Sequence, residues 1–171
     1  MLNLKNYIRD IPNFPKEGIV FKDLTPLWQD KSSFRNSIQL LKERYEKQNI
    51  DLIVAAEARG FIVGASLAYA MNTGFVPVRK PGKLPYKTIS ASYQLEYGTD
   101  TLTMHEDAIK EGQNILIVDD LLATGGTAKA MTKMVELLKG KVIEIAFLVE
   151  LTFLNGREKL KDYNLFSLIQ Y

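Results

Sequence analysis

The stretch that decides the fold is ILIVDDLLATGGT, which runs from Ile115 to Thr127. Four branched apolar residues lead into two adjacent carboxylates, Asp119 and Asp120, and a loop of small residues follows. The next segment, AKAMTKMVELLKG, has apolar residues at helical spacing. The pattern predicts a buried strand, a tight loop and a helix. Its charges pose a question, because a loop suited to phosphate stands beside two carboxylates that repel phosphate.

Outward from this stretch, strand-like and helix-like segments alternate along the chain. Short apolar runs at 51–56, 74–80, 114–120, 142–151 and 163–171 predict strands. Helical spacing predicts a short helix near 2–8, a helix capped by Ser32, another over 61–71, and one after Gly126 that ends with Gly140 at its C′ position. The segment 18–27 is interpreted as an irregular arm, and 88–97 as a hairpin or mobile loop. This alternation favours an α/β fold with a mostly parallel central sheet flanked by helices.

Composition limits the classes of function. The chain has 171 residues, which suits one domain, with 46% hydrophobic residues and a net charge of +2. There are no cysteines, so disulfides and thiolate metal sites are excluded. The polar start and the lack of an apolar run of ~18 residues favour a cytoplasmic protein that binds neither membrane nor nucleic acid.

The loop after the two carboxylates has the features of a phosphate site. Free backbone N–H groups and the positive end of the helix dipole would face a ligand there, and glycines let the backbone approach closely. Carboxylates cannot bind the phosphate, but they accept hydrogen bonds from sugar hydroxyls or from a hydrated Mg²⁺. A ribose 5-phosphate offers hydroxyls to the two carboxylates and a phosphate to the loop. The competing interpretation is an ordinary turn in which the acids serve as capping residues.

The whole thirteen-residue string resembles the phosphoribosyl-diphosphate motif of the type I phosphoribosyltransferases. The resemblance implies that Asp119 and Asp120 hold the ribose hydroxyls. It implies that the loop formed by Ala123, Thr124, Gly125, Gly126 and Thr127 holds the 5-phosphate.

A second motif, AAEARGF, also follows a predicted strand. Arg59 stands before a glycine, where its guanidinium and nearby N–H groups suit a diphosphate. By resemblance, Glu57, Ala58 and Arg59 form the diphosphate loop, and the Glu57–Ala58 peptide bond is cis. A surface arginine at the start of a helix is the alternative.

The third motif is VRKPGKLPYKTISASYQLEYGTD. Arg79, Lys80 and Lys83 give it positive charge, for which a solvated basic loop is the alternative. The string ASYQLEYGTD is similar to the catalytic loop of the family's adenine-specific members, which closes over the site and excludes water. That similarity makes Glu96 the catalytic residue that handles the purine proton, and places Tyr97 with the diphosphate-binding residues. Pro81 departs from the family, where several relatives have a basic residue.

The N-terminal string IPNFPKEGIVFKDLTPL is similar to the hood that covers the base in the same subgroup. Phe21 is expected to stack on a purine, and backbone groups of Val20 and Lys22 to read its edge. The family commonly has Arg at the position of Lys22, which matters little if the contact is through the backbone. For this stretch taken alone, a core aromatic is the favoured interpretation of Phe21.

Together the resemblance implies one phosphoribosyltransferase domain over residues 1–171, with a hood over approximately 1–30 and a flexible catalytic loop over approximately 81–99. The implied reaction joins adenine to 5-phosphoribosyl 1-diphosphate, giving AMP and diphosphate. Mg²⁺ would enter with the donor rather than through direct protein ligands, and the protein would be a homodimer. Two alternatives stay open: a regulator that binds the donor without turnover, and an enzyme for guanine, hypoxanthine or xanthine.

Overall fold

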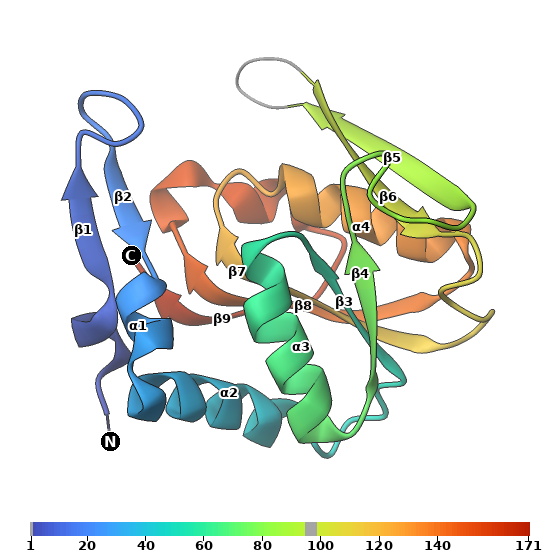
Figure 1. The fold of residues 1–171 in the computed structure, drawn as a ribbon, viewed down its shortest axis with the longest axis horizontal. Helices are drawn as coiled ribbons and strands as arrows, with labels where there is room; N and C mark the ends of the chain where they lie inside the picture. The colour runs from blue at the N-terminus through green and yellow to red at the C-terminus, as the bar shows by residue number, and fades with distance from the viewer. Residues whose placement is uncertain (1, 95–98) are drawn as a thin grey trace.

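The computed structural model describes residues 2–94 and 99–171. Its centre is a five-stranded sheet in the order β4-β3-β7-β8-β9, in which all neighbouring strands are parallel (Figure 1). The predicted α/β class and the five predicted strands are therefore confirmed. The strands are β3 (Leu52–Ala56), β4 (Gly74–Val78), β7 (Asn114–Leu122), β8 (Lys141–Glu150) and β9 (Leu165–Gln170).

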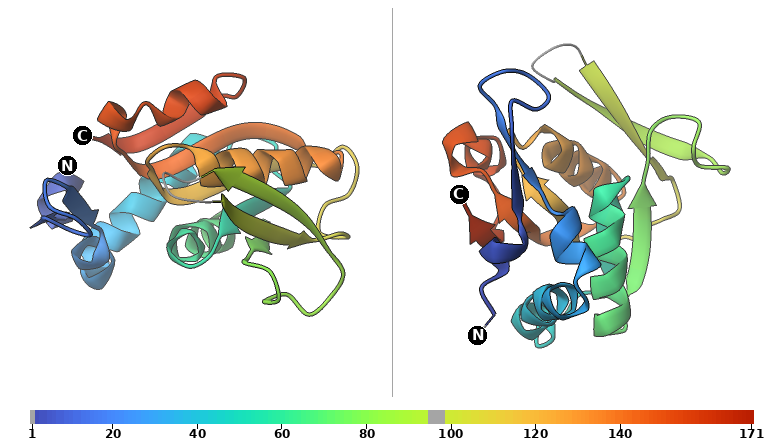
Figure 2. Two further views of the ribbon diagram at one scale, coloured as in Figure 1. Left: turned by 90° about the horizontal axis from the view of Figure 1, so that it is seen from above. Right: turned by 60° about the vertical axis from the view of Figure 1, so that its left-hand side comes forward.

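Helices cover both faces of this sheet because its strands are apolar on both sides. Along β7, Leu116 packs with the helices α2 (Lys31–Tyr45) and α3 (Arg59–Met71), whereas its neighbour Ile117 packs with α4 (Gly126–Leu137) on the opposite face. Figure 2 shows α3 and α4 on opposite sides of the sheet. Two apolar cores result, and the sheet separates them.

Two small antiparallel sheets flank the central one. The first pairs β1 (Arg9–Pro12) with β2 (Val20–Asp23), and the second pairs β5 (Thr88–Gln94) with β6 (Thr99–His105). Residue Arg79 at the end of β4 bridges Thr103 of β6, which ties the second hairpin to the main sheet. Both hairpins project toward the same side of the molecule (Figure 1). The remaining elements are η1 (Leu4–Tyr7), α1 (Thr25–Gln29), η2 (Thr152–Leu154) and η3 (Gly156–Leu160).

Several local predictions were wrong. The short helix expected near 2–8 is present as a 3-10 helix over Leu4–Tyr7, but β1 follows it, and the supposed irregular arm contains β2 and α1. Asp30, not Ser32, caps α2, since its carboxylate accepts hydrogen bonds from the N–H groups of Ser32 and Ser33. The left-handed residue after α4 is Lys139, with φ of 61°. Gly140 serves packing instead, because a Cβ there would lie 2.9 Å from Ile109 Cγ2.

The strand order explains where a ligand can bind. From β3 the chain crosses through α3 to β4 on one side, and from β7 it crosses through α4 to β8 on the other. The carboxyl ends of β3 and β7 therefore flank the point at which the sheet reverses direction, which is the usual ligand position in such folds. Within the described part of the chain, no helix is long and apolar enough to cross a membrane.

Candidate active site

The two carboxylates at the end of β7 are buried. Asp119 is 8% exposed and Asp120 is 5% exposed. Asp119 Oδ1 accepts a hydrogen bond of 2.9 Å from the backbone N–H of Asp120. Burial, followed by the neighbouring Asp120 charge, raises the pKa of Asp119 well above the ordinary aspartate value. Burial also raises the pKa of Asp120, although the positive charge of Arg59 opposes that shift.

Arg59 gives Asp120 a charge partner but not a hydrogen bond. Its Nε lies 2.8 Å from Asp120 Oδ2. Yet that buried oxygen has no hydrogen-bond donor among residues 2–94 and 99–171, because the contact lacks the required direction. A buried carboxylate oxygen without a donor is costly unless a ligand supplies one. The end of β7 therefore has free capacity to accept a hydroxyl hydrogen bond.

Beside Asp119 lies a cavity of about 80 Å³ whose wall includes Ala123, Thr124, Gly125, Gly126 and Thr127. Helix α4 begins at Gly126, and no side chain caps its first turn. Its N-terminal N–H groups are thus left for a ligand, and the helix dipole favours an anion there. The predicted phosphate loop and the first of the two acids do meet at one site.

A glycine far along the chain shapes this loop, and sequence reasoning missed it. A Cβ on Gly156 would lie 2.3 Å from the carbonyl oxygen of Ala123. In turn, a Cβ on Gly125, whose φ is 79°, would lie 2.6 Å from the carbonyl oxygen of Gly156. The two backbones are in contact, so the start of η3 packs directly against the phosphate loop. The pair Asn155-Gly156 was the available signal, since it is typical of a turn.

A second missed glycine brings α3 close to the carboxylates. A Cβ on Gly60 would lie 2.7 Å from Asp119 Oδ1. The residue after Arg59 must therefore be glycine for the start of α3 to approach the end of β7. This close approach is what brings Arg59 within reach of Asp120.

The diphosphate residues predicted from AAEARGF and VRK are linked to each other. The Glu57–Ala58 peptide bond is cis, as the resemblance implied. The Glu57 carboxylate accepts hydrogen bonds of 2.7 Å from Arg79 Nε and from the backbone N–H of Lys80. Despite partial burial, which raises it, the pKa of Glu57 lies below its usual range because of these two donors. The Glu57 side chain is thus engaged in holding the basic loop.

Lys83 joins this group through its backbone, since Arg79 Nη1 donates to the Lys83 carbonyl oxygen at 3.2 Å. The loop between β4 and β5 therefore folds back toward Glu57. The Arg79 guanidinium and the backbone N–H of Lys80 lie beside Glu57, next to the cis bond that follows β3, whereas the Lys80 ammonium pairs with Asp100.

Tyr93, another residue that sequence reasoning missed, connects the β5–β6 hairpin to the phosphate loop. Its hydroxyl accepts a hydrogen bond of 3.3 Å from Thr127 Oγ1 and donates one of 3.3 Å to Asp100. Asp100 in turn lies 3.1 Å from Lys80 Nζ. This chain of contacts joins the phosphate loop, the hairpin and the basic loop. Its signal in the sequence is weak, because a tyrosine in an alternating strand usually packs.

The β1–β2 hairpin, the segment predicted to be the hood, places an aromatic ring beside Arg59. Phe21 is half-buried, packs edge-on against Phe14, and has the Arg59 guanidinium 5.5 Å from its ring centre. The interpretation of Phe21 as a core aromatic is therefore wrong. Val20 is 45% exposed. The side chain of Lys22 instead pairs with Asp10 at 2.7 Å and lies over the Tyr171 ring. Any contact of Lys22 with a base thus falls to its backbone.

Two predicted residues, Glu96 and Tyr97, lie outside the described residues. The expected flexibility of segment 81–99 also stays a prediction, and β5 and the start of β6 occupy much of that segment. Within 2–94 and 99–171, no three His, Cys, Asp or Glu side chains are grouped so that they could hold a metal ion.

Comparisons with known proteins agree with this geometry. The chain is 55% identical to an adenine phosphoribosyltransferase of Thermotoga petrophila and 58% identical to one of Brachyspira hyodysenteriae, covering 99% of this chain and 100% of each relative. The crystal structure of adenine phosphoribosyltransferase from Thermoanaerobacter pseudethanolicus superposes with a TM-score of 0.95, at 58% identity and 98% coverage of both chains. The Saccharomyces cerevisiae enzyme, complexed with adenine and an imino-altritol bisphosphate, superposes at 0.90 and 44% identity, with 96% of both chains covered.

The family model for the phosphoribosyl transferase domain matches residues 27–170. That match spans most of the chain, including all five strands of the central sheet. The chain therefore belongs to the phosphoribosyl transferase family.

Proposed function

We propose that this protein transfers the phosphoribosyl group of 5-phosphoribosyl 1-diphosphate to adenine, forming AMP and diphosphate. The observation that carries the proposal is the buried Oδ2 of Asp120, which has no donor in the described part of the chain and stands beside a loop of uncapped N–H groups. A sugar with free hydroxyls and a 5-phosphate supplies both missing partners. The relatives named adenine phosphoribosyltransferase, aligned over 99% of the chain, support the choice of base.

In this proposal Asp119 and Asp120 accept hydrogen bonds from the ribose hydroxyls. The N–H groups and hydroxyls of Ala123 through Thr127 bind the 5-phosphate. Arg59 leaves its contact with Asp120 when the sugar arrives, and is then free for the diphosphate. In this exchange Asp120 has a charge partner before the sugar binds and hydrogen-bond donors afterwards, which limits the cost of burying it.

The leaving diphosphate is bound by the group of residues around the cis bond. Its partners are Arg59, Arg79, Lys80 and Lys83, with the backbone of Glu57 and Ala58, and Tyr97 by resemblance. Mg²⁺ fits this site as an ion held mainly by the donor, because the chain offers carboxylate oxygens but no three-residue metal cluster within its described residues. When bound, Mg²⁺ neutralises negative charge on the diphosphate.

The reaction breaks the bond between ribose C1 and the diphosphate oxygen, and the electron pair leaves with the diphosphate. Positive charge develops on the sugar, and adenine N9 forms the new bond to C1. The N9 proton passes to Glu96, the residue that the resemblance assigns to this step. Water would capture the same cation, so the hood and the β5–β6 hairpin must exclude it.

The hood selects the base. Phe21 stacks on the purine, and the backbone of Val20 and Lys22 reads its edge. The pairing of the Lys22 side chain with Asp10 supports a backbone contact, because it turns the charged group away from the base. In this arrangement the change from the family's usual Arg to Lys22 alters the hood without altering the base contact. The proposal also places the protein in the cytoplasm as a homodimer. Sedimentation of the purified protein would test the dimer.

The test is diphosphate release on mixing the protein with the donor, Mg²⁺ and one purine at a time. We expect release with adenine and AMP as the nucleotide product, identified by chromatography. A preference for guanine, hypoxanthine or xanthine would overturn the base assignment. Tight binding of the donor with no release for any purine would identify a regulator instead.

A further inference from the structure

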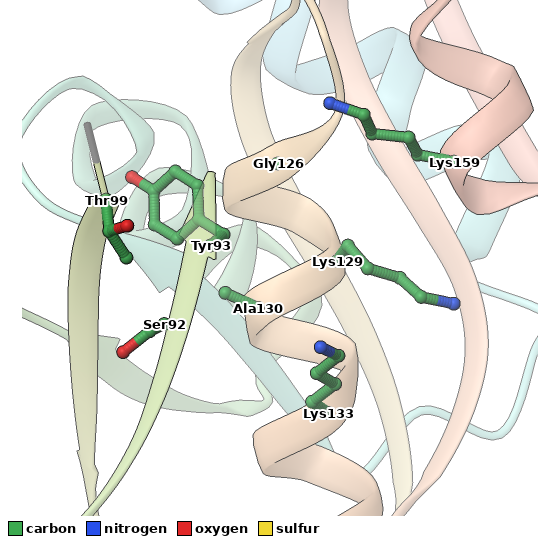
Figure 3. Close-up of a pocket in the computed structure, with 8 residues that line it drawn as sticks. All are labelled: Ser92, Tyr93, Thr99, Gly126, Lys129, Ala130, Lys133 and Lys159. Carbon is green, nitrogen blue, oxygen red and sulfur yellow. The ribbon is translucent and has the colours of Figure 1, made fainter. Parts of the chain in front are cut away.

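A second and larger cavity lies on the other side of the phosphate loop. It has a volume of about 280 Å³ and is formed by the β5–β6 hairpin, the first turns of α4 and the 3-10 helix η3. Figure 3 shows its lining residues, with the hairpin on one side of α4 and η3 on the other. They are Ser92, Tyr93, Thr99, Gly126, Lys129, Ala130, Lys133 and Lys159. None of the residues assigned above to the ribose, diphosphate or base is among them except Gly126.

The charge of this cavity is positive. Among the residues that the structure describes, three lysines line it and no carboxylate does. Lys133 and Lys159 form no ion pair with any residue of the described chain. Lys129 has a long contact of 3.7 Å with Asp162, whose side chain is 66% exposed, and its ammonium lies 4.9 Å from the centre of the Tyr163 ring. Lys133 and Lys159 therefore keep most of their capacity for an anion.

The shape and chemistry select one class of ligand. A single phosphate is small for 280 Å³, and lysines bind phosphates as point charges without a fixed fork. Ser92 also lines the cavity, although its hydroxyl forms a hydrogen bond with Thr101 on the face of the hairpin opposite Tyr93. A linear chain of two or more phosphates has the larger volume and the several negative charges that suit a cavity lined by lysines.

The position of this cavity couples it to the donor site. Gly126 and Tyr93 line both cavities. Lys159 belongs to η3, whose first residue, Gly156, touches the phosphate loop. An anion held by the lysines would repel the 5-phosphate through the shared wall, and binding at the two sites must be reciprocal. The occupant therefore weakens donor binding.

We propose that the cavity between the β5–β6 hairpin, α4 and η3 is a second anion site, which binds an oligophosphate chain and opposes binding of the phosphoribosyl donor. The inhibition part of this proposal rests on the proposed function, whereas the binding part does not.

Calorimetric titration with inorganic triphosphate tests the site directly, with Mg²⁺ kept in excess of total phosphate. The test variant is the double substitution Lys133→Gln, Lys159→Gln. The control, Lys31→Gln with Lys47→Gln, removes the same charge from exposed positions at the start of α2 and just beyond its end. We expect about tenfold weaker triphosphate binding in the test variant and unchanged binding in the control. Equal binding by all three proteins would overturn the proposal, as would equal weakening in both variants.

Kinetics then test the coupling. Triphosphate should raise the apparent KM for the donor in the natural protein and in the control, and raise it about tenfold less effectively in the test variant. An equal rise in all three would place the inhibitor in the substrate site and reject the coupling. Absence of turnover with intact triphosphate binding would count against the proposed function and leave the anion site standing. Replacing triphosphate by a pyrimidine nucleoside triphosphate separates the sources, since tighter binding would assign the site to a nucleotide and equal binding to free oligophosphate.

Discussion

Two neighbouring strands, β7 and β8, each carry a buried carboxylate, and the two carboxylates differ in how completely they are hydrogen-bonded. On β8, Glu150 is 3% exposed and receives two hydrogen bonds of 2.7 Å from Arg157. At the end of β7, Asp120 is 5% exposed and has one arginine nearby, yet its Oδ2 has no donor in the described chain. Similar burial thus accompanies complete pairing on one strand and incomplete pairing on the next.

The pKa values follow the pairing. The Arg157 hydrogen bonds hold the pKa of Glu150 below its usual range. Burial raises the pKa of Asp119, and the adjacent charge of Asp120 adds to the effect. A carboxylate with two short bonds to arginine stabilises the fold, whereas a buried carboxylate oxygen without a donor, such as Asp120 Oδ2, costs stability and is available to a ligand. Pairing therefore distinguishes Glu150 from Asp120 where burial does not.

The strongest test of this difference is the double substitution Asp119→Asn, Asp120→Asn. It removes two charged acceptors for the ribose, and hydrogen bonds to charged groups are worth about 1.5–3 kcal/mol each. We expect kcat/KM for the donor to fall on the order of 10³-fold, with a melting temperature at or above that of the natural protein. Steady-state kinetics and thermal unfolding measure the two quantities.

A matched control is Glu106→Gln with Asp107→Asn, which neutralises two adjacent acids that are exposed. Activity and melting temperature should both stay near their natural values. Loss of stability in the double-asparagine variant, with activity lost only in proportion to unfolding, would mean that the β7 acids are structural after all.

The opposite test is Arg157→Met on the structural side. It leaves Glu150 buried without its main partner, and breaking a buried pair usually costs 3–5 kcal/mol. Because the Arg157 side chain is 43% exposed, we expect about 3 kcal/mol of lost unfolding free energy. Chemical denaturation measures it. The control Arg35→Met changes an exposed arginine of α2 and should cost less than about 0.5 kcal/mol. If Arg157→Met lost as little unfolding free energy as this control, Glu150 and Asp120 would no longer differ in what their pairing contributes to stability.

Local pattern was enough to predict the elements that carry Asp119 and Asp120, whereas their contact with a ribose stays a prediction from the resemblance. The apolar run before Asp119 and Asp120, and the small residues after them, could only be a strand, a loop and a helix. The five strands of the sheet were predicted for the same reason, since each is a short apolar run between turn residues. Parallel strands then place their carboxyl ends together, which puts the predicted ribose and diphosphate residues at one edge of the sheet. The contact of Arg59 with Asp120 also needs the close approach at Gly60, which was not predicted.

The ion pairs and backbone contacts that stabilise the fold could not be predicted, because they join residues that are far apart in the sequence. Nothing near Glu144 indicates that Arg44, one hundred residues earlier, pairs with it at 2.7 Å. Gly156 fits against Ala123 only once η3 has packed on the phosphate loop. The pairing of Lys22 with Asp10 likewise depends on the register of β1 with β2. Such contacts are set by tertiary packing, which propensity and spacing do not report.

The pH dependence of stability sharpens the contrast further. The folded state holds protons on Asp119 and Asp120 at pH values where the unfolded chain, with an ordinary value of 3.8, has lost them. These groups therefore destabilise the fold as pH rises above 3.8, and the effect is complete above their raised pKa. The stability advantage of the double-asparagine variant should be largest near neutral pH and vanish below about pH 3.8.

Glu150 has the reverse sign, because its folded-state pKa is depressed below the ordinary 4.5. Its contribution is present above pH 4.5 and is lost as pH falls through the lower folded value. The unfolding free energies of the natural protein and of Arg157→Met should therefore become equal in acid. Unfolding free energies measured across pH 3 to 8 by denaturant titration would test both signs, and parallel curves for either variant would contradict the assignment for its strand.

The smallest effect is expected at Asp100, a carboxylate intermediate between the two kinds. It lies near the site and is 23% exposed, and the Lys80 ammonium at 3.1 Å holds its pKa below the usual range. Because Lys80 is largely exposed, solvent and salt screen the pair. Asp100→Asn should therefore leave the melting temperature nearly unchanged and raise the KM for the donor about two- to fivefold, by releasing the Lys80 ammonium from its ion pair. The difference from the natural protein should shrink as salt is added.

A loss of activity as large as that of the double-asparagine variant would show that a carboxylate with a partner can be as essential as one without. Pairing would then no longer separate the two classes of carboxylate.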